Sequence, residues 1–169
     1  MRLKTLFVLA STLFLSAAGA PHNPTRQLQK GTIVSPANGT PISPGATFDF
    51  EYTTMADFGV SSYNYTVWLL TSAPSTVFAQ SQNFAGGYFF GRFSQPNFPG
   101  NPDPKNPPPE TLTMPDFSKN PGGFGVGAPM TNGAFSLVVM EEYASGDGSV
   151  GMRIALAMNK IVYNATRAS

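Results

Sequence analysis

Few side chains in this chain of 169 residues could act as acids, bases or nucleophiles. His22 is the only histidine, and the chain has no cysteine. A Ser-His-Asp triad needs its histidine held in a packed site, whereas His22 lies in a polar, proline-containing stretch near the N-terminus. A copper-binding histidine brace would need a second histidine, and thiolate ligands are missing. We therefore predict no catalytic residue, no metal site and no cofactor.

Paired carboxylates are the remaining route to hydrolysis. Asp49 and Glu51 are two residues apart on one face of a predicted strand, and the neighbours Glu141 and Glu142 point to opposite faces of theirs. Glycoside hydrolysis needs two carboxyl groups across the scissile bond, one of them with a pKa raised by burial. We interpret all four as solvent-exposed surface charges, so we predict that the protein is not an enzyme.

The N-terminal segment has the pattern of a cleavable signal peptide. Arg2 and Lys4 precede the apolar stretch Leu6–Leu15, and small residues follow as far as Ala20. The apolar stretch is shorter than the roughly 20 residues that span a bilayer. This pattern predicts a secreted, extracellular protein with no membrane span.

Composition narrows the class of partner. Removal of Arg2 and Lys4 with the signal peptide leaves eight of the ten basic side chains against nine acidic ones. Because affinity for phosphate backbones and anionic membranes comes from clustered lysine and arginine, neither nucleic acid nor a membrane surface is an expected partner.

Three tripeptides match the acceptor pattern for N-glycosylation, at Asn38, Asn64 and Asn164. In a secreted protein, this pattern favours solvent-exposed positions for these asparagines.

The chain divides into three parts: a signal peptide over residues 1–20, a flexible lead over 21–30 and a single domain over 31–169. Within the domain, Thr47–Tyr52 alternates between apolar and acidic side chains, which is typical of a half-buried strand. Tyr63–Leu70 places Tyr63, Tyr65, Val67 and Leu69 on one face, so that Asn64, Thr66 and Trp68 fall on the other.

A loop rich in proline and glycine is predicted at about residues 94–129, with a short strand at Glu110–Met114. Prolines donate no hydrogen bond to a ladder, so the cluster around residues 102–109 is expected to form an extended, polyproline-like surface segment. Residues of candidate partner-binding surfaces are Trp68, Pro104, Pro107, Pro108 and Pro109.

The chain ends in two strongly apolar segments, Ala134–Tyr143 and Val150–Tyr163. The second segment fits strand and helix spacing, and we predict a strand because it completes a hairpin with the first. Seven or eight short strands then indicate an all-β fold: an antiparallel two-sheet sandwich, immunoglobulin-like in general architecture.

Several spaced residues resemble those of the fungal necrosis-inducing secreted protein family of small effectors. The matching pattern consists of Ile33-x-x-Pro36, Ile42-x-Pro44-Gly45-x-x-Phe48, Tyr63-x-x-x-Val67 and the terminal hairpin. This resemblance implies a non-enzymatic protein that binds receptor-associated immune kinases of a plant host. The Pro-Gly before the first core strand is also similar to the amino-terminal domain of yeast-type cell-wall glucan-assembly proteins.

Three functions from different classes follow. The first is a secreted interaction module or effector that binds a host or surface protein. The second is a carbohydrate-binding or cell-wall module that stacks sugar rings on the exposed aromatic candidates Trp68, Tyr88 and Tyr143. The third, and most distant, is a hydrolase.

Overall fold

The computed structural model describes residues 31–57, 60–74, 86–96, 102–117, 132–144 and 151–164. The predicted signal peptide and lead, residues 1–20 and 21–30, lie outside the described residues. All regular structure in the described ranges is β-strand, which confirms the all-β prediction, and no helix able to cross a membrane occurs there. The strands are β1 (Thr32–Ser35), β2 (Thr40–Ile42), β3 (Thr47–Asp49), β4 (Glu51–Thr53), β5 (Ala56–Asp57), β6 (Val60–Leu70), β7 (Gly87–Ser94), β8 (Thr111–Thr113), β9 (Asn132–Ala144) and β10 (Met152–Asn164).

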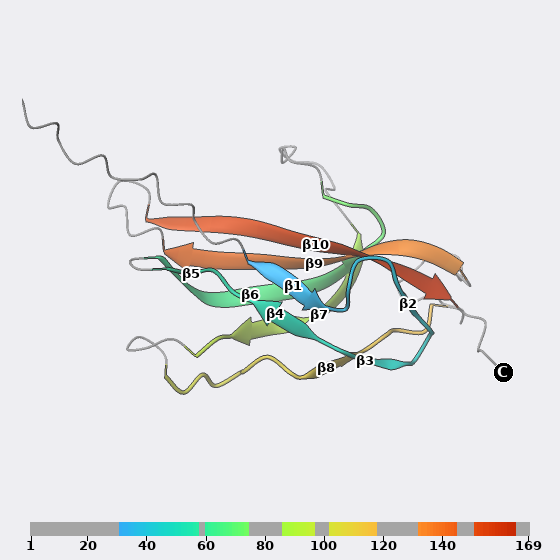
Figure 1. The fold of residues 1–169 in the computed structure, drawn as a ribbon, viewed down its shortest axis with the longest axis horizontal. Coiled ribbons are helices and arrows are strands. Elements are labelled where there is room, and N and C mark those ends of the chain that lie inside the picture. Colours follow the sequence, from blue (N-terminus) through green and yellow to red (C-terminus); the bar gives the residue numbers. More distant parts are fainter. Residues whose placement is uncertain are drawn as a thin grey trace, which may run out of the picture.

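The larger sheet has the strand order β2-β10-β9-β6-β5, and β7 also pairs with β6. Figure 1 shows its long strands β10, β9 and β6 lying side by side. β9 and β10 pair antiparallel along their whole length, from Met152 opposite Ala144 to Asn164 opposite Asn132. This pairing confirms the predicted terminal hairpin and the strand at its end. β2 pairs parallel with β10, which departs from the wholly antiparallel arrangement predicted.

A second, smaller layer covers one face of the larger sheet (Figure 1). It consists of the pairs β1-β4 and β3-β8, and only Phe50 separates β3 from β4. The Phe50 N–H donates a hydrogen bond of 2.8 Å to the Glu110 carbonyl, so the pairing between β3 and β8 extends as far as this residue. The two layers are compatible with a β-sandwich.

The core lies between the layers, where alternating side chains from both meet. Phe50 and Tyr52 are buried while Asp49 and Glu51 are exposed, as the alternation in Thr47–Tyr52 predicts. Tyr65, Val67 and Leu69 of the predicted inward row of β6 are buried as well. The core cluster comprises Ile33, Ile42, Phe50, Tyr52, Tyr65, Val67, Leu69, Phe93, Leu112, Met114, Phe117, Phe135, Leu137, Val139, Ile161 and Tyr163.

Polar contacts also join the layers. The Asn159 amide donates to the carbonyls of Ile33 and Pro36, at 3.2 and 2.9 Å, and ties β10 to the end of β1. The Tyr163 hydroxyl accepts a 2.8 Å hydrogen bond from the Phe117 N–H. These bonds satisfy polar groups that the packing of the layers removes from water.

The alternating apolar row of β10 faces away from the second layer. Met152, Ile154, Leu156 and Met158 lie on the outer face, and all but Leu156 are exposed. The inward row begins with Arg153, Ala155, Ala157 and Asn159, and it becomes strongly apolar only at Ile161 and Tyr163. Period-two spacing therefore identifies the strand without telling which of its faces is buried.

Adjacent residues of β10 provide a matched test of this orientation. Ile161 is 0% exposed and Val162 is 44% exposed. We expect Ile161→Ala to lower the free energy of unfolding by about 2–5 kcal/mol, because it leaves a cavity in the core. Val162→Ala is expected to change it by about 0.5 kcal/mol or less. Urea unfolding of both variants measures the difference, and equal losses would contradict the orientation.

Candidate functional site

Glu141 is a buried acidic residue in the core, which corrects its prediction as a surface charge. It lies on the inward face of β9 with 0% of its surface exposed. Its Oε2 accepts a 2.8 Å hydrogen bond from the Tyr52 hydroxyl, and its Oε1 accepts one of 2.6 Å from the Met55 N–H. A buried carboxylate is tolerated only when such donors replace its hydration. Because no part of Glu141 reaches solvent, it cannot act directly on a bound substrate.

The other carboxylates of the sequence prediction lie at the surface or near it. Asp49 and Glu51 are exposed, as predicted. Glu142 is half-buried on the outer face, where its Oε2 forms a 2.8 Å ion pair with Arg92.

Gly31 packs directly against the Glu141 carboxylate. A Cβ at this position would overlap both the Tyr52 hydroxyl and Glu141 Oε2. The chain can therefore pass over the buried carboxylate only where it carries no side chain.

Tyr65 stands beside this group with its hydroxyl unsatisfied. It is paired opposite Glu141 across β6 and β9, its ring centroid is 5.0 Å from that of Tyr52, and it is 1% exposed. Among the described side chains, its hydroxyl is the one buried polar atom without a hydrogen-bond partner.

Burial, and secondarily the charge of Glu141, raise the pKa of Tyr65 above its ordinary value of 10.0. Burial also raises the pKa of Tyr52, followed by its hydrogen bond to Glu141.

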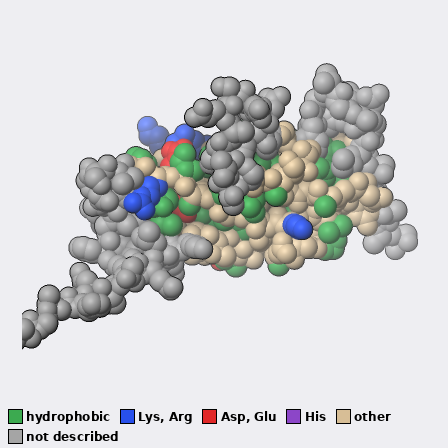
Figure 2. Space-filling view, turned by 90° about the horizontal axis from the view of Figure 1, so that it is seen from above, with side chains coloured by type: hydrophobic (Ala, Val, Ile, Leu, Met, Phe, Trp, Pro, Cys, Tyr) green, Lys and Arg blue, Asp and Glu red, His purple; other side chains and the backbone are tan. Residues whose placement is uncertain are grey.

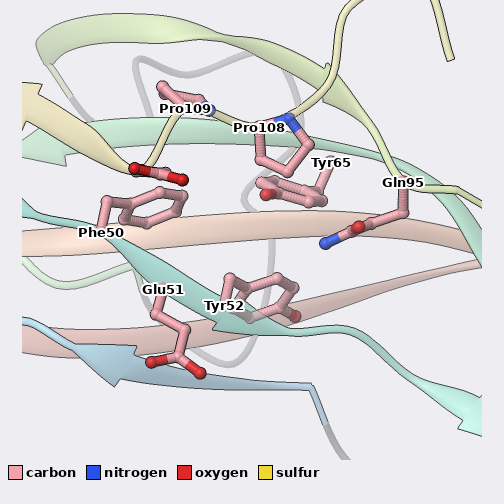
Figure 3. A pocket seen from close by; sticks show the side chains of 8 residues that line it. Phe50, Glu51, Tyr52, Tyr65, Gln95, Pro108 and Pro109 are labelled. Atoms are coloured by element: carbon pink, nitrogen blue, oxygen red, sulfur yellow. The ribbon is translucent and has the colours of Figure 1, made fainter.

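A pocket of about 230 Å³ lies next to Tyr65. Figure 3 shows the Tyr65 ring beneath Pro108, between Phe50 and Gln95. The lining residues are Phe50, Glu51, Tyr52, Tyr65, Gln95, Pro108, Pro109 and Glu110.

Two prolines explain why the second layer opens here. β3 and β8 pair in a register that places Asp49 opposite Thr111, and the Phe50 N–H still reaches the Glu110 carbonyl. Continued, this register would set Pro108 opposite Tyr52. Pro108 and Pro109 have no N–H to donate, so the ladder stops and a gap is left between β4 and the proline segment.

Only two of the four candidate partner-binding prolines lie at the pocket. Pro108 and Pro109 line the pocket, whereas Pro104 and Pro107 do not. Pro104 is half-buried and Pro107 is exposed. The described segment 102–110 contains no strand and bends at several residues, so its polyproline-like conformation stays a prediction, whereas the predicted strand at Glu110–Met114 is confirmed as β8.

The aromatic candidates for sugar stacking do not form one surface. Trp68 lies half-buried on the outer face as predicted, with its ring 4.6 Å from that of Phe89 and its Nε1–H donating to Thr66 Oγ1 at 3.1 Å. Tyr88 pairs opposite Leu69, whose side chain is in the core, so it lies on the other side of the sheet. Tyr143 is 7% exposed, which contradicts its prediction as an exposed residue.

The candidate glycosylation sites are all at strand ends or on the outer face. Asn38 is exposed in the turn before β2, and its Oδ1 accepts a 2.7 Å hydrogen bond from the Lys160 N–H. Asn64 is half-buried, and its Oδ1 accepts from Ser94 Oγ at 2.7 Å. Asn164 is the last residue of β10 and is half-buried.

Sequence reasoning missed the Glu141 group and the pocket. Strand parity carried a signal for the first, because Glu141 shares its face with Phe135, Leu137 and Val139. The pocket needs tertiary structure, since its lining comes from four separate segments of the chain.

No protein-family model matches the chain, and no curated protein is significantly similar to it. Within the described residues, no three histidine, cysteine, aspartate or glutamate side chains are grouped so that they could hold a metal ion.

Two single-atom variants test the Glu141 group. Tyr52→Phe removes a donor from a buried carboxylate, so we expect it to lower the free energy of unfolding by about 1.5–3 kcal/mol. Tyr65→Phe removes a hydroxyl that has no partner, so we expect it to be neutral or stabilising by up to about 1 kcal/mol. Urea unfolding at neutral pH measures both, and a loss on Tyr65→Phe equal to that on Tyr52→Phe would contradict the assigned contacts.

The raised pKa values predict a loss of stability in alkali. Below the unfolded value of 10.0, both states keep the phenolic protons of Tyr52 and Tyr65. As the pH rises above that value, the unfolded chain releases these protons while the folded chain retains them, so stability falls. We expect the urea midpoint to drop between about pH 8 and pH 11, and to drop less in Tyr65→Phe. An identical drop in both proteins would show that Tyr65 does not titrate late.

Proposed function

We propose that the protein is a secreted, non-enzymatic interaction module that binds an extended segment of a partner protein along the edge and outer face of β10. The observation that carries this proposal is an exposed apolar row beside a strand edge that is unpaired within the described residues. Met152 and Ile154 are 59% and 61% exposed, and Met158 and Val162 are exposed in the same row. Antiparallel sheets with one solvated face usually carry polar side chains on it, so this row favours a binding role.

The orientation of the β10 backbone follows from Lys160. Its N–H donates to Asn38 Oδ1 and its carbonyl accepts from the Gly39 N–H, each at 2.7 Å, so both groups point away from β9. Residues two apart in a strand share this orientation. The backbone groups of Met152, Ile154, Leu156 and Met158 therefore point to the same edge, and within the described chain β2 pairs there only with Ile161–Tyr163.

Such an edge fits the addition of one more strand. An extended peptide would form main-chain hydrogen bonds with the four residues, and alternate side chains would contact the apolar row. The half-buried outer-face residue Met140, which is opposite Leu156, enlarges the surface, and methionines suit it because they adapt their shape to a ligand. Seen from above, hydrophobic side chains reach the surface at several places among a few charged groups (Figure 2). Lys160, exposed at the end of the row, favours a partner segment with a carboxylate near that end.

The family resemblance supports the same class of function. It implies a host immune kinase as partner. The signal-peptide pattern predicts an extracellular location and the strand pattern an immunoglobulin-like type of sandwich, and all three belong to this proposal. The carbohydrate alternative has weaker support, because Trp68 and Tyr88 lie on opposite sides of the sheet and Tyr143 is buried.

Hydrogen exchange and a matched pair of variants test the proposal. Linear peptides selected from a random display library on the wild-type protein serve as the probe. We expect bound peptide to protect the amides of Met152, Ile154, Leu156 and Met158, which exchange fast in the free protein. Ile154→Lys should weaken binding about ten-fold or more, because it places a strongly hydrated charge in the apolar row.

Val34→Lys is the control, because Val34 is another exposed apolar strand residue, 48% exposed, in β1 of the second layer. It should leave peptide binding and the melting temperature unchanged. Protection confined to other strands, or equal effects of the two variants, would overturn the proposal. A dimer in sedimentation whose interface protects the same four amides would show that a second copy occupies the edge instead.

A further inference from the structure

We infer that the pocket beneath Pro108 binds a single organic cation, an ammonium or guanidinium group of about the size of a lysine or arginine side chain. This site is separate from the proposed strand edge. Tyr65 lies on the core-facing side of β6, whereas the apolar row of β10 lies on the outer face.

The charge of the lining favours a cation. Glu110 lines the pocket and is exposed at its rim, and the buried Glu141 carboxylate lies behind Tyr52, whereas the Glu51 side chain extends away from the pocket (Figure 3). No lysine or arginine is among the residues that line the pocket. Within the part of the chain that the structure describes, the Glu110 carboxylate has no ion-pair partner. A cation entering here would meet this negative charge at the rim without displacing an existing pair.

The aromatic rings supply the second part of such a site. Phe50, Tyr52 and Tyr65 surround the cavity, and the Tyr65 ring centroid lies 6.5 Å from that of Phe50. Ring faces attract cations, and the attraction grows when water is excluded. Pro108 and Pro109 provide apolar walls for the aliphatic stem of a lysine or arginine side chain (Figure 3).

The Tyr65 hydroxyl supplies the third part. Tyr65 is part of the pocket lining, and its hydroxyl is buried and unpartnered. A buried hydroxyl without a partner is destabilising, and an N–H donor that reaches it would relieve this cost. An ammonium or guanidinium donates several N–H groups and has no acceptor. It can therefore bond to the hydroxyl oxygen and to the Glu110 carboxylate together.

The size of the cavity limits the ligand to one such group. Pockets for drug-sized ligands measure roughly 300–1,000 Å³, and this cavity measures about 230 Å³. The cation can come from a side chain of a partner or from a free small molecule, and the test separates these sources.

Isothermal titration with small probes tests the inference. We expect N-acetyl-arginine methylamide and N-acetyl-lysine methylamide to bind, and N-acetyl-citrulline methylamide, the neutral analogue of the first, to bind at least about ten-fold more weakly. Affinity should fall as salt is added. Tighter binding of free tetramethylammonium than of the two capped amino acids would assign the site to a small-molecule cation and support the inference.

Variants locate the binding. Glu110→Gln should weaken it about two- to five-fold, because it removes the exposed charge from the rim. Tyr65→Phe should weaken it about five-fold through the lost acceptor. Asp103→Asn removes an exposed charge from the same proline segment outside the pocket and should have no effect. Because Glu110 is exposed, its variant is expected to fold, so the test does not depend on Tyr65→Phe.

Three results would overturn the inference. Equal binding of the citrulline and arginine probes would show that charge is not recognised. Stronger binding of methyl β-glucoside than of any cation would make the pocket a sugar site. Absence of binding by every probe would mean that the pocket holds water only. Ile154→Lys should bind the cations normally, so a failure of the strand-edge proposal and a failure of this one remain distinguishable.

Discussion

The arrangement of the two layers depends on one buried carboxylate. Glu141 extends from β9 of the larger sheet and accepts hydrogen bonds from Tyr52 of β4 and from the Met55 backbone just beyond it. Removing a carboxylate from water costs several kcal/mol, and these two donors offset part of that cost only while β4 stays in place. Gly31 packs directly against these contacts, and a side chain at this position would overlap them. A polar node of this kind specifies one packing of the layers where apolar contacts alone would allow several.

The pocket follows from this node and from the proline pair. Glu141 holds Tyr52 through a hydrogen bond, and the Tyr52 ring lies against that of Tyr65, 5.0 Å away, so that the two rings line the pocket side by side. Pro108 and Pro109 end the pairing of β8 with the continuous β3 and β4 segment, so the second layer is open beside these two prolines. The ring lining therefore comes from long-range packing and the opening from local backbone chemistry, and neither alone would produce a cavity.

Local periodicity predicted much of the fold. The alternation over Thr47–Tyr52 identified the correct buried face, because acidic and aromatic side chains leave no ambiguity. Periodicity was insufficient for β10, where methionine and isoleucine form one row and small or polar residues the other, yet the first row is exposed. Here the partner strand decides: Ala157 is opposite Val139, which belongs to the core cluster, and that pairing fixes the parity of all of β10. The pocket and the parallel β2-β10 pair could not be predicted for a similar reason, since both depend on contacts between distant segments.

The two halves of β10 contribute differently to stability, and this difference is what allows its edge to serve in binding. Its C-terminal half is anchored by Ile161 and Tyr163 in the core, by β2 on its edge and by the Asn159 bonds to the end of β1. Its N-terminal half places Ala155 and Ala157 inward, and such small side chains bury little apolar area. The larger apolar side chains of that half lie on the outer face, where they add little to the core. Changes to the outer row can therefore alter what the strand binds while the anchored half and the full-length pairing with β9 maintain the fold.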